Sequence, residues 1–167
     1  LSLHDALPIL LYIFGNYNGD IFNFQMAAEM AEMEEDIEVC LSIAGEDVAS
    51  GPRAKAQEKN IRRGVAGIFF VYKCAGAAAA EMLPLDEVYR IAEKTKQLVA
   101  TMGVAMSPCT VPRIGYPSFA MADDEMEIGM GIHGEPGIRR GKICAADEIV
   151  KEILPPVMQD LQLQRGD

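Results

Sequence analysis

The stretch Leu10-Leu11-Tyr12-Ile13-Phe14-Gly15-Asn16-Tyr17-Asn18-Gly19-Asp20 joins a short apolar run to a polar turn. An apolar run bounded by Gly15 and Asn16 is typical of a buried strand in a parallel sheet. Asp20 precedes a segment with helical spacing of apolar residues, and it stands where a helix N-cap is expected. A strand, a polar turn and a helix in this order place the turn at the carboxyl end of a sheet, where α/β proteins bind ligands.

Strands and helices alternate along the rest of the chain. Further strands are predicted at residues 37–43 and 125–132, and residues 103–111 are predicted to be a strand that runs into a loop. Helices are predicted at residues 65–80, 85–102 and 147–161, the last one kinked or interrupted at Pro155-Pro156. The alternation favours an α/β fold with a mostly parallel sheet and flanking helices. The first of these helices is expected to be buried, with one apolar face formed by Val65, Ile68, Phe69, Tyr72, Ala75 and Ala79.

Charge and composition restrict the classes of function. The chain has 167 residues, half of them hydrophobic, which suits one domain with a real core. Its formal net charge of -10 argues against a nucleic-acid partner, because such binding needs basic surfaces that neutralise phosphates. No apolar run approaches the roughly 20 residues that span a bilayer, so no membrane interaction is expected.

The cysteines and histidines form no metal-ligand pattern. Four cysteines are widely spaced without a Cys-x-x-Cys pair, and the chain has only two histidines. We therefore expect free thiols in a reducing cytoplasm and no metal site.

The two ends of the sequence indicate an incomplete protein. Residues 1–9 resemble the translation of a sequencing adapter, so these residues, including His4, are left out of the predicted site. The alternative is a genuine N-terminal strand followed by an ordinary turn. The polar residues 164–167 follow a helical pattern without a closing element. Residues 10–167 are therefore expected to form part of a larger domain.

His133 stands between Gly131 and Gly134, directly after the strand predicted at residues 125–132. Glycine has no Cβ, so a ligand can approach closely, and neutral imidazole can act as a base or nucleophile near pH 7. The alternative is a tight turn in which His133 is only a satisfied polar residue. Glu135 either orients this loop or is an exposed turn carboxylate, and we favour the second interpretation.

Five segments stand in the order Gly15-Asn16-Tyr17-Asn18-Gly19-Asp20 with Phe22-Asn23-Phe24, Arg63-Gly64-Val65-Ala66-Gly67, Lys73-Cys74-Ala75-Gly76-Ala77-Ala78-Ala79, Met102-Gly103-Val104-Ala105-Met106-Ser107-Pro108-Cys109-Thr110-Val111-Pro112 and Gly131-Ile132-His133-Gly134-Glu135-Pro136-Gly137. Together they resemble the substrate-binding component of dihydroxyacetone kinase, from Leu10 to the C-terminus. The resemblance implies an incomplete portion of a two-part substrate-binding domain. The family's opening region, with a glycine-rich loop and a second functional histidine, and its C-terminal part are not matched.

The resemblance implies roles for two residues. By its place in the motif, His133 corresponds to the histidine that forms a covalent hemiaminal with the ketone carbonyl of dihydroxyacetone. Asp20 corresponds to the acid or base that assists phosphoryl transfer at a substrate hydroxyl, whereas the residues alone indicate an N-cap. Many members carry a lysine where this sequence has Gly15. In having Gly-Asn-Tyr at this place, the sequence resembles relatives that act on four-carbon ketoses such as erythrulose. The implied substrate-binding residues are Gly15, Asn16, Tyr17, Gly19, Gly131 and Gly134.

The function that the resemblance implies is to hold dihydroxyacetone or a related short ketose for phosphorylation of its terminal hydroxyl. No Gly-x-x-x-x-Gly-Lys-Ser/Thr loop occurs in the sequence, so no cofactor is expected on this chain. The donor, ATP with Mg2+ or a phosphotransferase-system protein, is expected on a nucleotide-binding subunit or domain. A cytoplasmic homodimer is expected. The alternatives are a ketose-sensing regulatory paralogue without phosphoryl transfer and a fragment that is inactive by itself.

Overall fold

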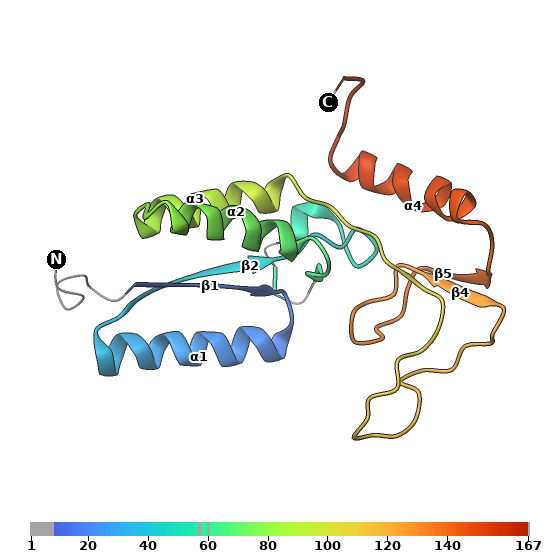
Figure 1. Cartoon of the computed structure of the whole chain (residues 1–167), viewed down its shortest axis with the longest axis horizontal. Coiled ribbons are helices and arrows are strands. Elements are labelled where there is room, and N and C mark those ends of the chain that lie inside the picture. The colour runs from blue at the N-terminus through green and yellow to red at the C-terminus, as the bar shows by residue number, and fades with distance from the viewer. Residues whose placement is uncertain (1–8, 57, 60, 167) are drawn as a thin grey trace.

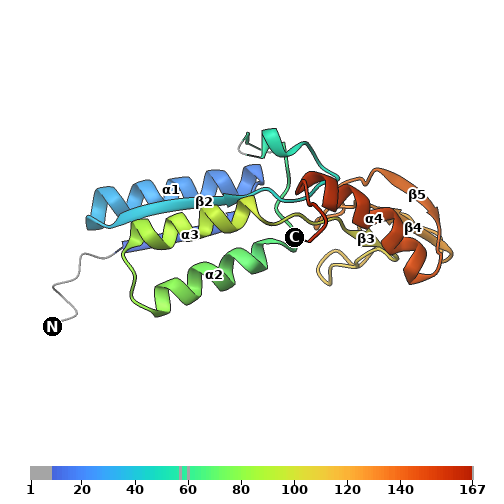
Figure 2. The same ribbon diagram turned by 90° about the horizontal axis from the view of Figure 1, so that it is seen from above.

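The structure, a computed structural model, describes residues 9–56, 58–59 and 61–166. The segment predicted to derive from an adapter lies outside these residues, apart from Ile9. The described chain forms two neighbouring sheets (Figure 1). A two-stranded sheet lies between helices on both of its faces, and a three-stranded sheet has a single helix over it (Figures 1 and 2). The fold class is α/β, as predicted.

The first sheet is built from the strand, turn and helix that open the described chain. β1 (Ile9–Gly15) and β2 (Glu38–Ala44) pair in parallel over their whole length. α1 (Asn18–Glu35) connects the two strands and packs against both. The Phe24 ring of α1 stacks on the Phe14 ring of β1, with the ring centroids 4.6 Å apart. Both predicted strands and their parallel pairing are confirmed.

Asp20 does not cap α1, so the predicted N-cap is wrong. The cap position is Tyr17, whose backbone is extended (φ -122°, ψ 140°), and no side chain caps the helix. The Tyr17 carbonyl accepts a hydrogen bond from the Ile21 amide at 2.9 Å, so the helix has already begun before Asp20. Asp20 lies in the first turn, where a carboxylate near the positive end of the helix dipole stabilises by about 0.3–1 kcal/mol.

The other face of the parallel sheet is covered by α2 (Ile68–Ala80) and α3 (Leu85–Gln97). The helix predicted at residues 65–80 is confirmed from Ile68 onward, but Ala75 alone of its predicted buried face belongs to the buried cluster. Phe69 and Tyr72 are 58% and 49% exposed, because α2 turns small side chains rather than rings toward α3. The buried cluster consists of Val71, Ala75, Ala78, Val88 and Ala92, with Leu11 and Ile13 of β1 packed against it.

The chain leaves α3 to extend alongside β2. Asp47 and Thr101 form an isolated parallel bridge, and the Thr101 amide donates to the Glu46 carbonyl at 3.0 Å. This pairing requires extended backbone, so α3 ends at Gln97 rather than at the predicted residue 102.

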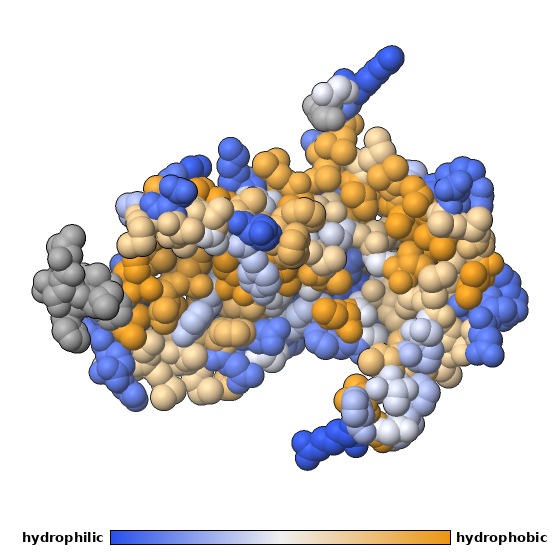
Figure 3. Space-filling model, viewed as in Figure 1, coloured by the Kyte–Doolittle hydropathy of each residue, from blue (hydrophilic) through white to orange (hydrophobic). Residues whose placement is uncertain are grey.

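Apolar side chains are exposed over α2 and along β1, as the orange atoms in Figure 3 show. Phe69 and Phe70 of α2 are both more than half exposed. Within the described residues, β1 pairs only with β2, so its other edge is open. A helix with apolar residues all round is typical of a buried element. This surface is therefore suited to contact with another chain.

We expect the 167-residue chain to self-associate through α2 and the open edge of β1, because unpaired edges and exposed apolar faces favour association. Light scattering after size-exclusion chromatography should show species heavier than 18.2 kDa. Phe70→Glu should shift the population toward monomer, whereas Leu98→Glu, exposed at the end of α3, should not. A monodisperse wild-type monomer would contradict this expectation.

The second sheet is antiparallel and contains β3 (Val104–Ala105), β4 (Glu125–Ile128) and β5 (Arg139–Lys142), in this order. β5 was not predicted, because its basic sequence lacks the alternation of apolar residues that is typical of a strand. β4 ends at Ile128 rather than at the predicted residue 132. Gly129 follows it with a positive φ of 79°, which ends the strand and starts a turn.

α4 (Ala146–Asp160) lies over the antiparallel sheet and is tied to the first half of the chain at its last residue. The Asp160 carboxylate accepts hydrogen bonds from Arg62 at 2.8 Å and from Arg53 at 2.6 Å. The Arg62 side chain is only 1% exposed, so Asp160 is the counter-charge of a buried cation. The helix continues through Pro155-Pro156 and is not interrupted there.

Asp160→Ala should lower the free energy of unfolding by about 3–5 kcal/mol, because the Arg62 guanidinium would remain buried without its counter-charge. Urea unfolding followed by circular dichroism measures this loss. The control is Glu152→Ala, which removes the partner of the solvent-screened Arg139 and should cost much less stability than Asp160→Ala. Equal losses in the two variants would show that the buried ion pair of Asp160 contributes no more to stability than an exposed ion pair does.

The same cluster should make stability depend on pH. Burial acts to raise the pKa of the Asp160 carboxyl, but hydrogen bonds from Arg62 and Arg53 hold that pKa below its usual value. A lowered folded pKa contributes stability above the unfolded pKa of about 3.9, and this contribution is lost as the pH falls through the folded pKa. The difference in unfolding free energy between wild type and Asp160→Ala should therefore shrink in strong acid.

Candidate functional site

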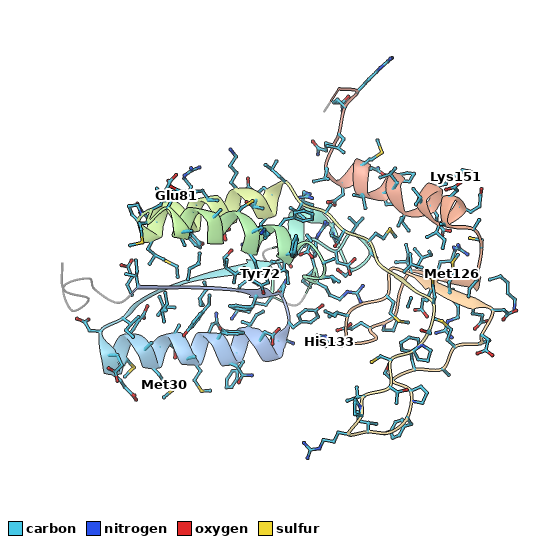
Figure 4. All side chains as sticks on the ribbon, in the orientation of Figure 1. Met30, Tyr72, Glu81, Met126, His133 and Lys151 are labelled. Atoms are coloured by element: carbon cyan, nitrogen blue, oxygen red, sulfur yellow. The ribbon has the colours of Figure 1, made fainter. Side chains whose placement is uncertain are left out.

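The turn at residues 129–137 carries His133 into the region between the two sheets (Figure 4). The Gly131 amide donates to the Glu135 carbonyl at 2.9 Å, and the Gly134 amide donates to the Gly131 carbonyl at 3.1 Å. Gly134 has a positive φ of 87°, and a Cβ there would lie 3.3 Å from the Phe119 ring. Glycine at position 134 therefore satisfies both the conformation and the close approach.

Both oxygens of the Glu135 carboxylate contact His133. Oε1 lies 3.0 Å from the imidazole Nδ1, and Oε2 accepts a hydrogen bond from the His133 amide at 3.0 Å. The imidazole is 63% exposed, whereas the Glu135 side chain is 33% exposed. Burial acts to raise the pKa of the Glu135 carboxyl, but hydrogen bonds from backbone amides and the His133 ring hold it below its usual value. Glu135 is thus an ionised acceptor at neutral pH.

Tyr17 joins the histidine turn to the parallel sheet. Its ring meets the His133 ring edge to face, with centroids 4.7 Å apart and an interplanar angle of 82°. Its hydroxyl donates to the Gly64 carbonyl at 3.0 Å. Burial, reinforced by the Glu135 carboxylate, raises the pKa of the Tyr17 hydroxyl above its usual range, so the group remains a neutral donor. Tyr17, in the turn after β1, thereby contacts His133, which lies much later in the sequence.

Gly15 leaves room for this tyrosine. A Cβ at position 15 would lie 2.8 Å from a Tyr17 ring carbon and 3.2 Å from the Gly64 carbonyl oxygen. A larger residue here would have to displace the Tyr17 ring, which contacts His133. Gly15 therefore shapes the site by its lack of a side chain.

The Asn16 side chain stabilises the turn that follows β1. Its side chain is buried, and the amide nitrogen donates to the Glu58 carbonyl at 2.9 Å and to the Arg62 carbonyl at 3.0 Å. These contacts hold the loop before Arg63 against the end of β1. The structure therefore gives Asn16 a structural role, whereas its substrate-binding role stays a prediction.

Arg63 connects the histidine turn to the loop that follows β2. Its guanidinium donates to the Asp47 carboxylate at 2.8 Å and to the Gly129 carbonyl at 2.9 Å. The neighbouring Glu46 is buried, which raises the pKa of its carboxyl, and it accepts a hydrogen bond from the Gly67 amide at 2.9 Å. These contacts connect the loop after β2, the loop before α2 and the turn of His133.

A cavity of about 500 Å³ opens beside His133 between the antiparallel sheet and the loop that follows β3. Its wall combines apolar side chains with the imidazole, two hydroxyls and one thiol. This volume exceeds that of a three- or four-carbon sugar. The residues that line it are Val65, Gly103, Val104, Ala105, Ser107, Cys109, Val111, Ser118, Phe119, Met130, Gly131, Ile132, His133 and Gly134.

The structure brings together only some of the predicted site residues. Tyr17 contacts His133, and Gly131 and Gly134 line the same cavity. Asp20 lies in the first turn of α1 and is not part of the cavity wall. Burial raises the pKa of the Tyr72 hydroxyl, and the charge of Asp20 raises it further. Gly19 precedes Asp20, and a Cβ there would meet nothing within 4 Å.

Several residues of the site were missed from sequence. Glu135 was favoured as an exposed turn carboxylate, yet it contacts the imidazole directly. Ser107, Ser118 and Phe119 belong to irregular segments, where no periodicity indicates which side chains face inward. The one usable signal was the spacing His-x-Glu in a glycine-rich turn, which places a carboxylate within reach of the ring.

A model of the Dak1 domain matches residues 8–167. The chain belongs to the Dak1 domain family. Among curated relatives of this Dak1 chain is the dihydroxyacetone-binding subunit DhaK of PTS-dependent dihydroxyacetone kinase 2 from Listeria innocua. It is 44% identical over 157 residues, which cover 94% of this chain and 46% of the relative. The D-erythrulose kinase of Mycolicibacterium smegmatis is 39% identical over 159 residues, 95% of this chain and 27% of that one. The Dak1 chain thus spans about half the length of the DhaK relative.

Solved structures agree with the family assignment. The dihydroxyacetone kinase operon co-activator Dha-DhaQ superimposes with a TM-score of 0.80 at 28% identity, covering 95% of this chain and 47% of that one. The dihydroxyacetone kinase of C. freundii superimposes with a TM-score of 0.73 at 30% identity, covering 90% of this chain and 26% of that one.

The described residues contain neither a membrane-spanning helix nor a cluster of metal-ligating side chains. No helix in the described ranges is long and apolar enough to cross a bilayer. No cluster of three or more metal-ligating side chains occurs in the same part of the chain. The four cysteines are unpaired, as predicted, and only Cys40 is partly buried.

Proposed function

We propose that this chain is the ketose-binding part of a dihydroxyacetone-type kinase and holds its substrate as a covalent hemiaminal on His133. The observation that carries the proposal is the exposed His133 imidazole in the wall of a cavity of about 500 Å³. Membership of the Dak1 family and the similarity to dihydroxyacetone-binding subunits support the kind of ligand.

The proposed chemistry needs a carbonyl group. A lone pair of the imidazole adds to the ketone carbon, the carbonyl π electrons move to oxygen, and that oxygen takes up a proton from solvent. A polyol such as glycerol has no carbonyl and cannot react. Bond formation discriminates between the two more strongly than size does, since a single small group in a cavity contributes only about 1–3 kcal/mol.

Asp20 is proposed as the acid or base that assists transfer of phosphate to the terminal hydroxyl. Gly15, Asn16, Tyr17, Gly19, Gly131 and Gly134 are proposed to shape or contact the substrate site. The phosphoryl donor, ATP with Mg2+ or a phosphotransferase-system protein, is proposed to reside on a separate nucleotide-binding subunit or domain. The working assembly is proposed to be a homodimer of this component.

The substrate class is a short ketose with three or four carbons. A relative that is 39% identical is a D-erythrulose kinase. This similarity supports a four-carbon ketose beside dihydroxyacetone itself.

Carbon-13 NMR with dihydroxyacetone labelled at the carbonyl tests this proposal. The ketone signal should be replaced by a protein-bound tetrahedral carbon signal, and labelled erythrulose should behave in the same way. Labelled glycerol should show no bound signal. Binding of the ketose with an unchanged carbonyl signal would contradict the covalent step.

A second candidate function is a ketose sensor that regulates through a partner. It is favoured by the superposition on the operon co-activator Dha-DhaQ, with a TM-score of 0.80. Both functions require ketose binding, so phosphate transfer separates them. Incubation with a nucleotide-binding kinase component and ATP should yield the phosphorylated ketose for the kinase and none for the sensor.

A further inference from the structure

We infer that Glu135 is a positioning residue that holds His133 as its Nδ1–H tautomer and leaves the Nε2 lone pair for the ligand. The contact is the 3.0 Å separation between Glu135 Oε1 and the imidazole Nδ1. The inference rests on the proposed function for its chemical purpose, but the tautomer itself does not depend on any substrate.

The tautomer follows from the chemistry of the two groups. An ionised carboxylate can only accept hydrogen bonds, so the ring nitrogen facing it must donate one. Hydrogen bonds hold the pKa of the Glu135 carboxyl below its usual value, so the group is ionised at neutral pH. A neutral imidazole carries one ring proton. If Nδ1 holds that proton, Nε2 must carry the free lone pair.

The carboxylate is held in place by the turn itself. Its second oxygen accepts the His133 amide at 3.0 Å, so one carboxylate binds both the backbone and the ring of the same residue. Gly131 provides the space, because a Cβ there would lie 2.2 Å from Glu135 Oε2 and 2.7 Å from a terminal nitrogen of Arg63. The Tyr17 ring packs edge to face on the imidazole and limits its rotation.

This arrangement suits a reversible addition. When Nε2 bonds to the ketone carbon, the carbonyl pair moves to oxygen, which takes up a proton, and the ring becomes cationic. The Nδ1–H then donates a charge-assisted hydrogen bond to Glu135, which stabilises the cation. In reversal, the adduct hydroxyl returns its proton to solvent, the C=O bond re-forms, and the N–C bond breaks with its electron pair going back to Nε2. The Nδ1–H tautomer therefore directs reactivity to one nitrogen and stabilises the adduct.

Nitrogen-15 NMR of histidine-labelled protein reads the tautomer directly, without substrate. Spectra are recorded in a pH series, and those at its basic end report the neutral ring. Wild type should show a protonated Nδ1 and an unprotonated Nε2 for His133. The chain contains one other histidine, so the signals missing from His133→Asn assign the resonance.

Glu135→Gln should move the proton to Nε2, because the glutamine amide donates where the carboxylate accepted. Gly131→Ala keeps the carboxylate but displaces it from the ring, and should shift the tautomer in the same direction. Adduct formation with carbonyl-labelled dihydroxyacetone should weaken about 10–100-fold in both variants, the usual effect of losing a group that orients a histidine. Asp123→Asn removes an exposed carboxylate from the neighbouring loop and should change neither readout.

The outcomes separate this inference from the proposed function. A folded Glu135→Gln protein with the wild-type tautomer and wild-type adduct affinity overturns the positioning role. If the glutamine variant does not fold, an unchanged tautomer in folded Gly131→Ala overturns it equally. A wild type that shows the expected Nδ1–H tautomer but forms no adduct supports the positioning role and refutes the hemiaminal function.

Discussion

Replacing His133 by alanine should abolish covalent capture of dihydroxyacetone. The imidazole in the cavity wall is the proposed nitrogen nucleophile, and alanine offers no lone pair to the carbonyl carbon. The bound tetrahedral carbon signal that we expect in carbon-13 NMR should therefore disappear. Thermal stability should change little, since the ring is 63% exposed and its main contacts are with Tyr17 and Glu135.

Tyr116→Ala provides the matched control for this experiment. Tyr116 is an exposed aromatic residue in the loop after β3, and it is not part of the cavity wall. Its replacement should leave the bound signal intact. Undiminished capture by the His133→Ala protein would eliminate the hemiaminal mechanism and leave ketose binding, if observed, to hydrogen bonds alone.

Asp20→Asn should lower the turnover of phosphate transfer by about 10²–10⁴-fold in the assembled kinase, the usual loss for an acid or base group. Stability should change by no more than about 1 kcal/mol, because Asp20 makes no side-chain cap and contributes only through the helix dipole. Steady-state kinetics with the nucleotide-binding component, together with thermal unfolding, measure the two effects separately.

Asp86→Asn is the matched control for Asp20→Asn. Asp86 also lies in the first turn of a helix, α3, where it is exposed, and it is not part of the cavity wall. It should reproduce the small stability change without the loss of turnover. If Asp20→Asn reduces stability while turnover per folded molecule is unchanged, Asp20 has a structural role only.

Local patterns in the sequence were sufficient for the parallel unit. An apolar run followed by a polar turn and a helix indicates β1 and α1, and a second apolar run indicates β2. These elements follow from the periodicity of neighbouring residues, which is a property of the sequence itself. The same is true of His133 as a candidate, because the two glycines around it indicate a turn open to close approach.

Errors arose where long-range contacts decide the structure. β5 is basic and is held as a strand by pairing with β4 rather than by its own pattern. The buried face of α2 depends on the small residues of α3, not on where the large rings lie along α2. Burial of Arg62 depends on Asp160, 98 residues away, and no local signal indicates that partner.

The sequence alone determined the α/β class, the parallel strand pair, the motifs shared with the Dak1 family and the choice of His133, because each depends on residues close together in the chain. The tertiary structure decided which side chains contact the His133 ring. Packing brings Tyr17 against its ring across the two sheets, and the folded turn places the Glu135 carboxylate 3.0 Å from Nδ1. Both contacts depend on the three-dimensional path of the backbone, and that path sets the proton position on the ring.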